Sequence, residues 1–429
     1  MGNSARRTYN KWAILFTVLV MTFMVCLDSS IVTVALPVIQ RELGVGLDDI
    51  QWVSSVYLLS TCVVLLPFGR LGDRLGKVYV FQAGVVVFTV GSLLCGLAPT
   101  LPVLVGARVV QGVGCALAMA NNMGIITEAF PAHERGRAMG MLSTFVALGM
   151  MAGPVMGGAI VSAFAWEGIF LINVPVGIIS FVVGLRTLPH VRPDHDAGEG
   201  ALSFGDSLRL CFSSATFTIN FSTMLIVFVG IGASEFALPF YFQDAHGYSA
   251  AISSLLFMTL PVVNAVVGPI SGTVSDRSGC EVPTVVGLSV YVAGMLAVSV
   301  LGEASPMLQV IASVALMSLG TSIFQSPNNS LFMTSAPSEA LGFAGSLGSL
   351  ARYAGMAAGI SMCSRVLYGQ MSVAAGYEVT SYVEGRPDIF LFGFASVFHV
   401  LAALAALGLV LTLVRLVRTQ RAKAARRAR

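Results

Sequence analysis

The amino-acid sequence predicts an all-α membrane protein with about twelve transmembrane helices, arranged as two pseudo-symmetric six-helix bundles. The first observation is composition. Of the 429 residues, 56% are hydrophobic and only 10% are charged, whereas about a quarter of the residues of a soluble domain are charged. The second observation is that apolar runs of about 20 residues, the length that crosses a bilayer once, recur along the chain. The third is an internal repeat that relates the two halves.

The apolar runs place twelve spans in order along the chain. They cover residues 13–36, 51–69, 78–97, 102–127, 138–162, 169–188, 215–242, 250–273, 282–301, 307–332, 343–368 and 389–414. The first run is long and opens the series, so we expect a retained span rather than a cleaved signal peptide.

The positive charges predict the orientation, because cytoplasmic segments of membrane proteins carry an excess of Lys and Arg. With the N-terminus inside, most Lys and Arg residues fall in cytoplasmic segments, and only Arg41 and Arg386 fall outside. We therefore expect a multi-pass protein of the plasma or inner membrane with both termini in the cytoplasm. The net charge of +3 then reflects topology, and no nucleic-acid partner is expected. The basic tail anchors this topology and meets anionic lipid.

Residues 189–206 are the longest polar interruption and contain Pro, Gly and Asp, which favours a cytoplasmic linker. The predicted parts are a bundle over 1–188, this linker, a bundle over 207–414 and a basic tail over 415–429. Four segments match across the linker in the same order and about 205 residues apart, as expected of duplicated six-span halves with a binding site near the bilayer midplane. The matching pairs are Gly69–Gly76 with Gly272–Gly279, Ala35–Pro37 with Ala237–Pro239, Asn121–Asn122 with Asn328–Asn329, and Gly149 and Gly153 with Gly355 and Gly359.

Four stretches of the first half carry a resemblance to a known family. They are Leu27-Asp28-Ser-Ser-Ile-Val-Thr-Val-Ala-Leu-Pro37, Gly69-Arg-Leu-Gly-Asp73-Arg-Leu-Gly-Lys77, Arg108-Val-Val-Gln111-Gly112-Val-Gly114, and Gly149-Met-Met-Ala-Gly153-Pro154-Val-Met-Gly157-Gly158. With them the chain resembles the major facilitator superfamily, and its first half resembles the drug:proton antiporters. The resemblance implies the major facilitator fold and secondary transport. The branch with this span-one signature usually has fourteen spans, but residues 189–206 contain no apolar run, so we predict twelve.

We interpret the loop after span two as part of a gating motif. Together with the acidic residue at the end of span four, it comprises Gly69, Asp73, Arg74, Gly76, Lys77 and Glu128. The glycines permit a tight crossing, and a carboxylate such as Asp73 is favourable near a helix N-terminus. We hypothesise that Asp73, Lys77 and Glu128 form a charge network that latches the cytoplasmic side. The alternative is a topology signal combined with a helix cap.

Span five carries small residues on one helix face. Gly149, Gly153 and Gly157 recur every four residues, and Gly158 follows. Such a ridge lets another backbone approach closely, and Pro154 invites a bend. Helix packing explains the ridge on any account, and the resemblance implies that it marks antiporters rather than importers.

Three charged residues within spans are the main functional candidates, because a charge in the bilayer costs at least about 2.5–3.5 kcal/mol. Asp28, Arg108 and Glu235 all lie roughly 9–12 Å inside the outer face, by helix rise. We expect Asp28 to be the leading proton carrier, able also to face a cationic substrate, with Glu235 as a second carrier. Arg108 would be the positive partner that modulates the exchange. The alternatives are a buried ion pair or cap for Asp28, and a structural role for Glu235.

Other polar and aromatic residues are candidates to line a cavity. They are Tyr57, Gln111, Phe236, Phe240, Asn328, Asn329 and Arg352. The asparagines either line an inner gate or form helix–helix hydrogen bonds. Arg352 needs a partner or a watery cavity, and most aromatic side chains in such a bundle serve packing.

The motifs argue against an enzyme, since we find no nucleophile arrangement, phosphate loop or metal cluster, and no cofactor is expected. The seven cysteines are scattered and read as apolar packing residues. We predict proton-coupled export of lipophilic, cationic small molecules by a monomer that contacts protons and membrane lipids. Export or flipping of a lipid or glycolipid is the alternative, a transport-inactive sensor or scaffold is a further one, and uptake of a metabolite stays open.

Overall fold

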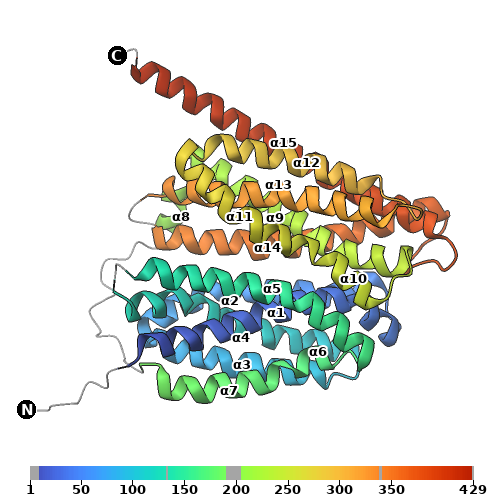
Figure 1. Cartoon of the computed structure of the whole chain (residues 1–429), viewed down its shortest axis with the longest axis horizontal. Coiled ribbons are helices and arrows are strands. Elements are labelled where there is room, and N and C mark those ends of the chain that lie inside the picture. The colour runs from blue at the N-terminus through green and yellow to red at the C-terminus, as the bar shows by residue number, and fades with distance from the viewer. Residues whose placement is uncertain (1–8, 132–133, 190–203, 338–340, 428–429) are drawn as a thin grey trace, which may run out of the picture. The chain divides into compact units, whose positions relative to one another are not determined.

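The structure is a computed structural model that describes residues 9–131, 134–189, 204–337 and 341–427, and over these residues the chain is helical without β-strands (Figure 1). The elements are α1 (Lys11–Leu43), α2 (Leu47–Leu75), α3 (Lys77–Gly96), α4 (Leu101–Ala129), α5 (Arg135–Ala163), α6 (Gly168–Leu171), α7 (Asn173–Thr187), α8 (Phe204–Phe212), α9 (Ala215–Phe240), the π-helix η2 (Tyr241–Ala245), α10 (Ala250–Phe257), α11 (Thr259–Ser278), α12 (Glu281–Ser299), α13 (Met307–Thr334), α14 (Leu341–Ala375) and α15 (Pro387–Arg427).

Every predicted span coincides with helix, so the predicted all-α fold class is confirmed. The sixth span is α6 with α7, the seventh is α9 with η2, and the eighth is α10 with α11. Ten helical segments of the described chain are long and apolar enough to cross a membrane. The other two predicted spans are α2, of 29 residues, and α14, of 35 residues and rich in Gly, Ala and Ser. Both exceed the roughly 20 residues that a crossing needs.

The chain folds as two compact units. The first contains Met1–Val32 and Leu59–Glu199, and the second contains Thr33–Leu58 and Gly200–Arg429. The ends of α1 and α2 on either side of Gly44 therefore belong to the second unit. Within that unit, Gln243 donates to the carbonyl of Val34 at 3.1 Å, and Ser364 donates to Asp48 at 2.5 Å.

Glycines bring neighbouring helices into backbone contact at equivalent places in the two units. In the first unit a Cβ at Gly91 on α3 would lie 2.6 Å from the backbone of Gln111 on α4. In the second unit a Cβ at Gly294 on α12, which lies 203 positions after Gly91, would lie 2.4 Å from the backbone of Met317 on α13. Since only a residue without a side chain fits, these contacts explain why α3 packs on α4, and α12 on α13, over such long stretches. The repeat seen in the sequence is thus a repeat of helix seams.

Two glycines also form the tight crossings that follow the second helix of each half. Gly76 between α2 and α3 has φ of 104°, and Gly279 between α11 and α12 has φ of 87°. Backbone in this region is reached readily by glycine. The expected crossing therefore occurs in both copies of the repeat.

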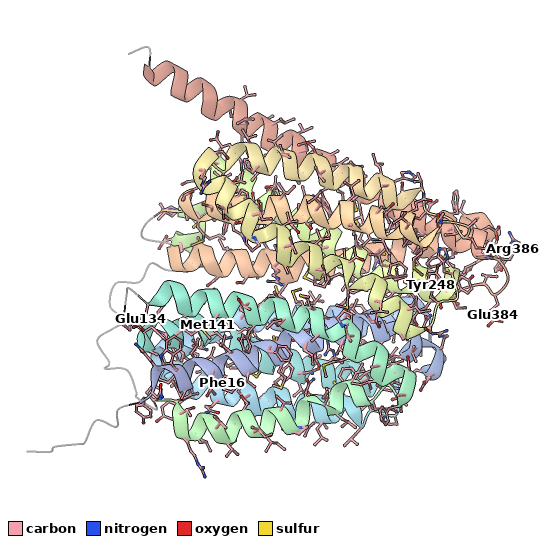
Figure 2. The ribbon with its side chains drawn as sticks, viewed as in Figure 1. Phe16, Glu134, Met141, Tyr248, Glu384 and Arg386 are labelled. Carbon is pink, nitrogen blue, oxygen red and sulfur yellow. The ribbon has the colours of Figure 1, made fainter. Side chains whose placement is uncertain are left out.

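Two segments differ from the expected linker and tail. Most of the predicted linker, residues 190–203, lies outside the described residues, but its last part opens α8, whose Cys211 packs among Phe217, Met224 and Phe332. Helix α15 runs through the predicted tail to Arg427 and extends past the ends of α12 and α13 (Figure 1). At the other end of the second unit, the loop between α14 and α15 carries exposed Glu384 and Arg386 (Figure 2).

Candidate functional site

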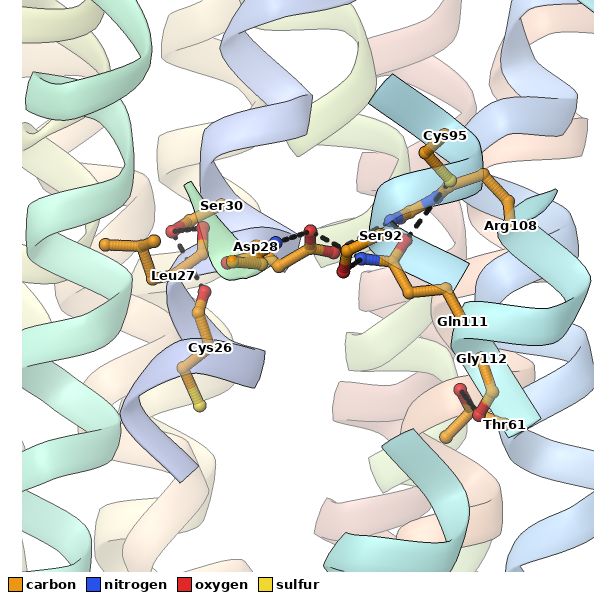
Figure 3. A network of polar contacts seen from close by, with 11 residues as sticks. Cys26, Leu27, Asp28, Ser30, Thr61, Ser92, Cys95, Arg108, Gln111 and Gly112 are labelled. Carbon is orange, nitrogen blue, oxygen red and sulfur yellow. Dashed lines mark hydrogen bonds and ion pairs between the residues drawn. The ribbon is translucent and has the colours of Figure 1, made fainter. Parts of the chain in front are cut away.

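A buried ion pair lies at the centre of the first unit. Asp28 on α1 has 0% and Arg108 on α4 has 1% of its side chain exposed, and Arg108 Nη1 lies 2.7 Å from Asp28 Oδ2 (Figure 3). The guanidinium also stands over the ring of Phe170 at 5.6 Å, a favourable cation–π arrangement. The two residues that we expected at similar depth therefore contact each other directly.

Amide side chains complete the coordination of the Asp28 carboxylate. Gln111 Nε2 donates to Asp28 Oδ1 at 2.8 Å, and Asn173 Nδ2 on α7 donates to the same oxygen at 2.7 Å. Gln111 Oε1 in turn accepts from Arg108 at 2.5 Å, and Gln111 Nε2 also donates to Ser92 on α3 at 2.8 Å. Figure 3 shows the side chains of Asp28, Ser92, Arg108 and Gln111 converging between their helices. The network joins α1, α3, α4 and α7.

The charges of this network compensate each other. A buried ion pair is tolerated when its remaining hydrogen-bonding capacity is satisfied, and removal of one partner costs about 3–5 kcal/mol because the other charge is left unpaired. The carboxylate has three donors, and the guanidinium faces both a carboxylate and an amide oxygen. A polar cluster of this kind inside an apolar bundle can respond to a change in charge, because any change in the protonation of Asp28 alters the whole network.

The other intramembrane charges form a separate site in the second unit. Glu235 on α9 is half-buried and interacts electrostatically with Arg352 on α14. The Arg352 guanidinium lies 5.9 Å from the ring of Phe228. Tyr291 on α12 is buried and also interacts electrostatically with Glu235. No hydrogen bond to the Glu235 carboxylate occurs among the described residues.

Comparison with known proteins decides the family. The model of the Major Facilitator Superfamily matches residues 18–360. The chain belongs to the major facilitator superfamily. The expectation drawn from the motifs is therefore confirmed, and the protein is a multi-pass membrane transporter.

Relatives within the superfamily cover most of the chain. It is 31% identical over 385 residues to the riboflavin transporter RibZ of Clostridioides difficile, which covers 78% of this chain and 84% of that protein. It is 31% identical over 411 residues to the tetracenomycin C resistance and export protein of Streptomyces glaucescens, which covers 83% of this chain and 76% of that protein. A solved structure of a bacterial homologue of the human lysosomal transporter Spinster, inward-facing and unoccupied, matches with a TM-score of 0.76 and 16% identity, over 96% of this chain and 97% of that one. At that identity the match shows the fold alone.

The gating motif of this major facilitator is described in part. Lys77 Nζ lies 2.5 Å from Glu128 Oε1, with 26% and 63% of the two side chains exposed. Gly69, Asp73 and Arg74 lie within α2, but their surroundings fall outside what the structure describes. A second ion pair, Lys11 with Glu134 at 2.5 Å, had no sequence signal, because the residues are 123 positions apart.

The span-five ridge packs against α1. A Cβ at Gly149 would lie 2.7 Å from the carbonyl oxygen of Phe23, and one at Gly153 would lie 2.8 Å from the backbone nitrogen of Ile31. Gly157 faces Ile31 as well, while Gly158 and Pro154 are buried within α5, which continues through the proline. The ridge is therefore the close backbone contact between α5 and the helix that carries Asp28. In the second unit Gly355 and Gly359 meet α9 in the same way.

The remaining cavity candidates have different surroundings. Phe236 and Phe240 are fully buried and contact each other at 5.1 Å between ring centroids, so they pack inside the second unit. Tyr57 is also buried. Asn328 is buried with neither amide atom hydrogen-bonded among the described residues, whereas its neighbour Asn329 is exposed.

Sequence reasoning missed two polar residues that the superfamily motifs do not mark. Asn173 completes the Asp28 network, and a single Asn within the apolar run of span six was the available signal. Arg415, which we assigned to the basic tail, is 3% exposed and donates to Thr284 on α12 at 2.9 Å and to Asn220 on α9. This arginine differs from the exposed Arg418 of the same predicted tail, because it joins three helices.

Proposed function

We propose that the protein is a proton-coupled secondary transporter that exports lipophilic, cationic small molecules across the inner membrane by alternating access. In this proposal both termini are cytoplasmic, and the two helical bundles cover residues 1–188 and 207–414. One proton entering at 100 mV supplies about 2.3 kcal/mol, but expelling a monovalent cation costs the same amount, so a one-for-one exchange is driven by the pH gradient.

The observation that carries the proposal is the buried network of Asp28, Arg108, Gln111 and Asn173. Ionisable residues inside a membrane bundle are functional by default, since their cost would otherwise be removed by apolar substitution. The network rests against the α1–α5 glycine contact at Gly149 and Gly153. A change in the charge of Asp28 therefore affects the packing of α1 against α5, two helices that must move during transport.

The relatives support export. The Streptomyces glaucescens protein is named for tetracenomycin C resistance and export, and a relative from Mycobacterium tuberculosis that is 28% identical is named a multidrug resistance protein. Both extend over more than four-fifths of this chain.

The proposal is tested by transport in proteoliposomes with an imposed pH gradient, across a panel of dyes and lipids. We expect gradient-dependent accumulation of lipophilic cations, abolished by a protonophore and strongly reduced in Asp28→Asn. A wild-type protein that moves these compounds at the same rate without a proton gradient contradicts proton coupling. Glu303→Gln, which removes an exposed carboxylate between α12 and α13, is the matched control.

A second candidate substrate is a planar heteroaromatic such as riboflavin. One observation favours it: the relative named a riboflavin transporter is aligned over 84% of its own length. Riboflavin is uncharged at neutral pH, so its inclusion in the panel separates this candidate from the export of cations.

A further inference from the structure

We infer that a file of water molecules runs between α1, α3 and α7 and carries protons between the Asp28 network and the end of the first unit at which α1 begins. This is the cytoplasmic end in the proposed topology. The inference rests on the proposed function, in which the charge of Asp28 changes during transport, and it identifies the route that the proton takes inside the first unit.

The position of Asp28 requires such a route. None of its side chain is exposed, and its two oxygens accept from Arg108, Gln111 and Asn173, which lie on helices of the first unit. A proton therefore reaches or leaves this carboxylate through the interior of that unit. Protons can be relayed through chains of water, so the route needs polar groups that hold water at intervals along it.

Helix α7 presents polar and small residues along this interior. Starting from the residue that donates to Asp28, this α7 stripe comprises Asn173, Gly177, Ser180, Gly184 and Thr187. Their spacings of four, three, four and three residues place them on one face of the helix. The stripe is roughly 21 Å long by helix rise. It ends where the hydroxyl of Thr187 lies 2.9 Å from that of Thr17 on α1.

The side chain of Gln82 on α3 points its amide at the α7 stripe. A Cβ at Gly184 would lie 2.2 Å from Gln82 Nε2, so the amide lies directly against the backbone of α7. Gln82 is 5% exposed, and neither its nitrogen nor its oxygen has a hydrogen-bond partner among the described residues. A buried amide without partners is unfavourable, and buried polar atoms that no protein group engages are commonly bound to ordered water. Gln82 therefore marks a water site.

Polar atoms continue this site along the stripe. In the described part of the chain, Oγ of Ser180 and Oδ1 of Asn173 also lack a partner, and these residues are 4% and 1% exposed. The hydroxyl of Thr89 lies against Gly177 and donates to a backbone carbonyl, so its oxygen can still accept. A polar group thus recurs roughly every 4.5–6 Å of helix rise, which one or two waters about 2.8 Å apart can bridge.

The α1 side of this path is apolar. Met21 and Met24 lie between Thr17 and Asp28 at helical spacing on one face of α1, and both are buried. An apolar wall opposite a polar one confines water to a line. A proton then leaves the Asp28 carboxyl group for the nearest water, each water passes one proton to the next, and one proton emerges beside Thr187. The exchange makes and breaks O–H bonds alone.

The internal repeat indicates that helix packing does not require these polar groups. At the offset of 203 that pairs Gly91 with Gly294, Gln82 corresponds to the apolar Val285. Asp28 has no acidic counterpart at this offset either. The glutamine and the carboxylate are therefore absent together from the second half, as expected if one serves the other.

The test is the exchange of the Asn173 side-chain amide protons with D₂O, in protein reconstituted in lipid bilayers and followed by solid-state NMR with ¹⁵N-labelled asparagine. The Asn173 signal is identified by its absence in Asn173→Leu. Gln82→Leu and Ser180→Val each remove a water site and should slow the exchange at least about tenfold, because one hydrogen-bonding position of the path is lost. Gln309→Leu, which removes an exposed amide from α13, is the matched control and should exchange as wild type does.

Ser180→Thr separates the hydroxyl from the packing. Thr has the shape of Val but keeps the hydroxyl, so this variant should exchange much faster than Ser180→Val. Partial unfolding accelerates exchange, so a damaged fold cannot imitate the expected slowing. Three results would overturn the inference: an Asn173 amide that does not exchange in wild type, a wild-type rate in either Gln82→Leu or Ser180→Val, and equal rates in Ser180→Val and Ser180→Thr.

Proton-driven transport of tetraphenylphosphonium and ethidium in proteoliposomes is measured in parallel. Slower exchange in Gln82→Leu together with slower proton-driven transport supports the file as the proton route, whereas slower exchange with transport at the wild-type rate overturns that role. If wild type is driven by the pH gradient while Gln82→Leu and Ser180→Val exchange as wild type does, the inference fails and the proposed function stands. If wild type shows no proton-driven transport, the proposed function fails.

Discussion

The ion pair between Asp28 and Arg108 makes a quantitative prediction about stability. Asp28→Asn removes the negative charge, places an amide N–H₂ among three donors and leaves Arg108 without its carboxylate partner in a buried site. We expect a loss of about 3–5 kcal/mol, the cost of breaking a buried pair from one side. Arg108→Gln should cost a similar amount, because the Asp28 charge is then the unpaired one.

The double variant, in which both Asp28 and Arg108 are replaced, tests the coupling between the two charges directly. When both charges are removed, no buried charge is left without a partner, so the double variant should be more stable than the sum of the single losses implies. We expect an interaction free energy of about 2–3 kcal/mol, at the upper end of the range for contacting residues.

Unfolding by SDS titration, followed by helicity and by the fluorescence of Trp166 in a background with Trp12 and Trp52 replaced by Phe, measures these quantities. Trp166 is a local reporter because it contacts Phe170 at 6.2 Å between ring centroids, and Phe170 in turn faces Arg108. The exposed pair of Lys77 and Glu128 gives the matched control cycle, with an expected coupling below about 1 kcal/mol. Strict additivity at Asp28 and Arg108, or a single-variant loss below about 1 kcal/mol, would refute the reasoning from burial.

Three further predictions follow from local contacts. Gly153→Val should lower the free energy of unfolding by at least about 1–3 kcal/mol, because the new side chain overpacks against α1. Gly106 faces open space, so Gly106→Val should change the free energy of unfolding by no more than about 0.5 kcal/mol. Thermal unfolding in detergent compares the two variants, and equal effects would contradict the close α1–α5 contact. Lys77→Gln should change the free energy of unfolding by less than about 1 kcal/mol, because Glu128 is largely exposed. A large loss of transport at unchanged stability would support the hypothesis that Lys77 and Glu128 latch the cytoplasmic side. Unchanged transport would argue against it. Burial lowers the pKa of His246 below its usual 6.5. The unfolded chain therefore binds the proton first, and the stability of the fold decreases as the pH drops below about 6.5. His246→Gln should lose less stability than wild type between pH 7 and pH 5, and an identical pH profile would exclude this contribution.

The sequence predicted the helices because the bilayer imposes a length and a composition on each span. It also predicted that Asp28 and Arg108 lie at similar depth, since depth follows from helix rise. Their direct contact required the structure, because the residues are 80 positions apart and depth says nothing about which helix faces which.

The missed or misplaced residues share a physical cause. In a membrane bundle both the lipid-facing and the buried faces of a helix are apolar, so periodicity does not reveal which face points inward. The inward packing of Phe236 and Phe240 could not be distinguished from the lining of a cavity. Asn173 and Arg415 were visible as polar residues within or at the end of apolar runs, but their partners depend on helix rotation. The close helix–helix contacts at glycine were predicted only in span five, where glycine recurs every four residues.

The burial of Arg415 has a consequence for the order in which the second unit is completed during synthesis. Its partner Asn220 precedes it by 195 residues. At about 5–20 residues per second, Asn220 waits roughly 10–40 s on the ribosome before the arginine is made. Until then α9 and α12 lack the side chain that joins them to α15, and the nascent second unit stays open at that end. Chains that terminate before Arg415 should therefore be recognised by membrane quality control and degraded, while chains that end just after it should accumulate.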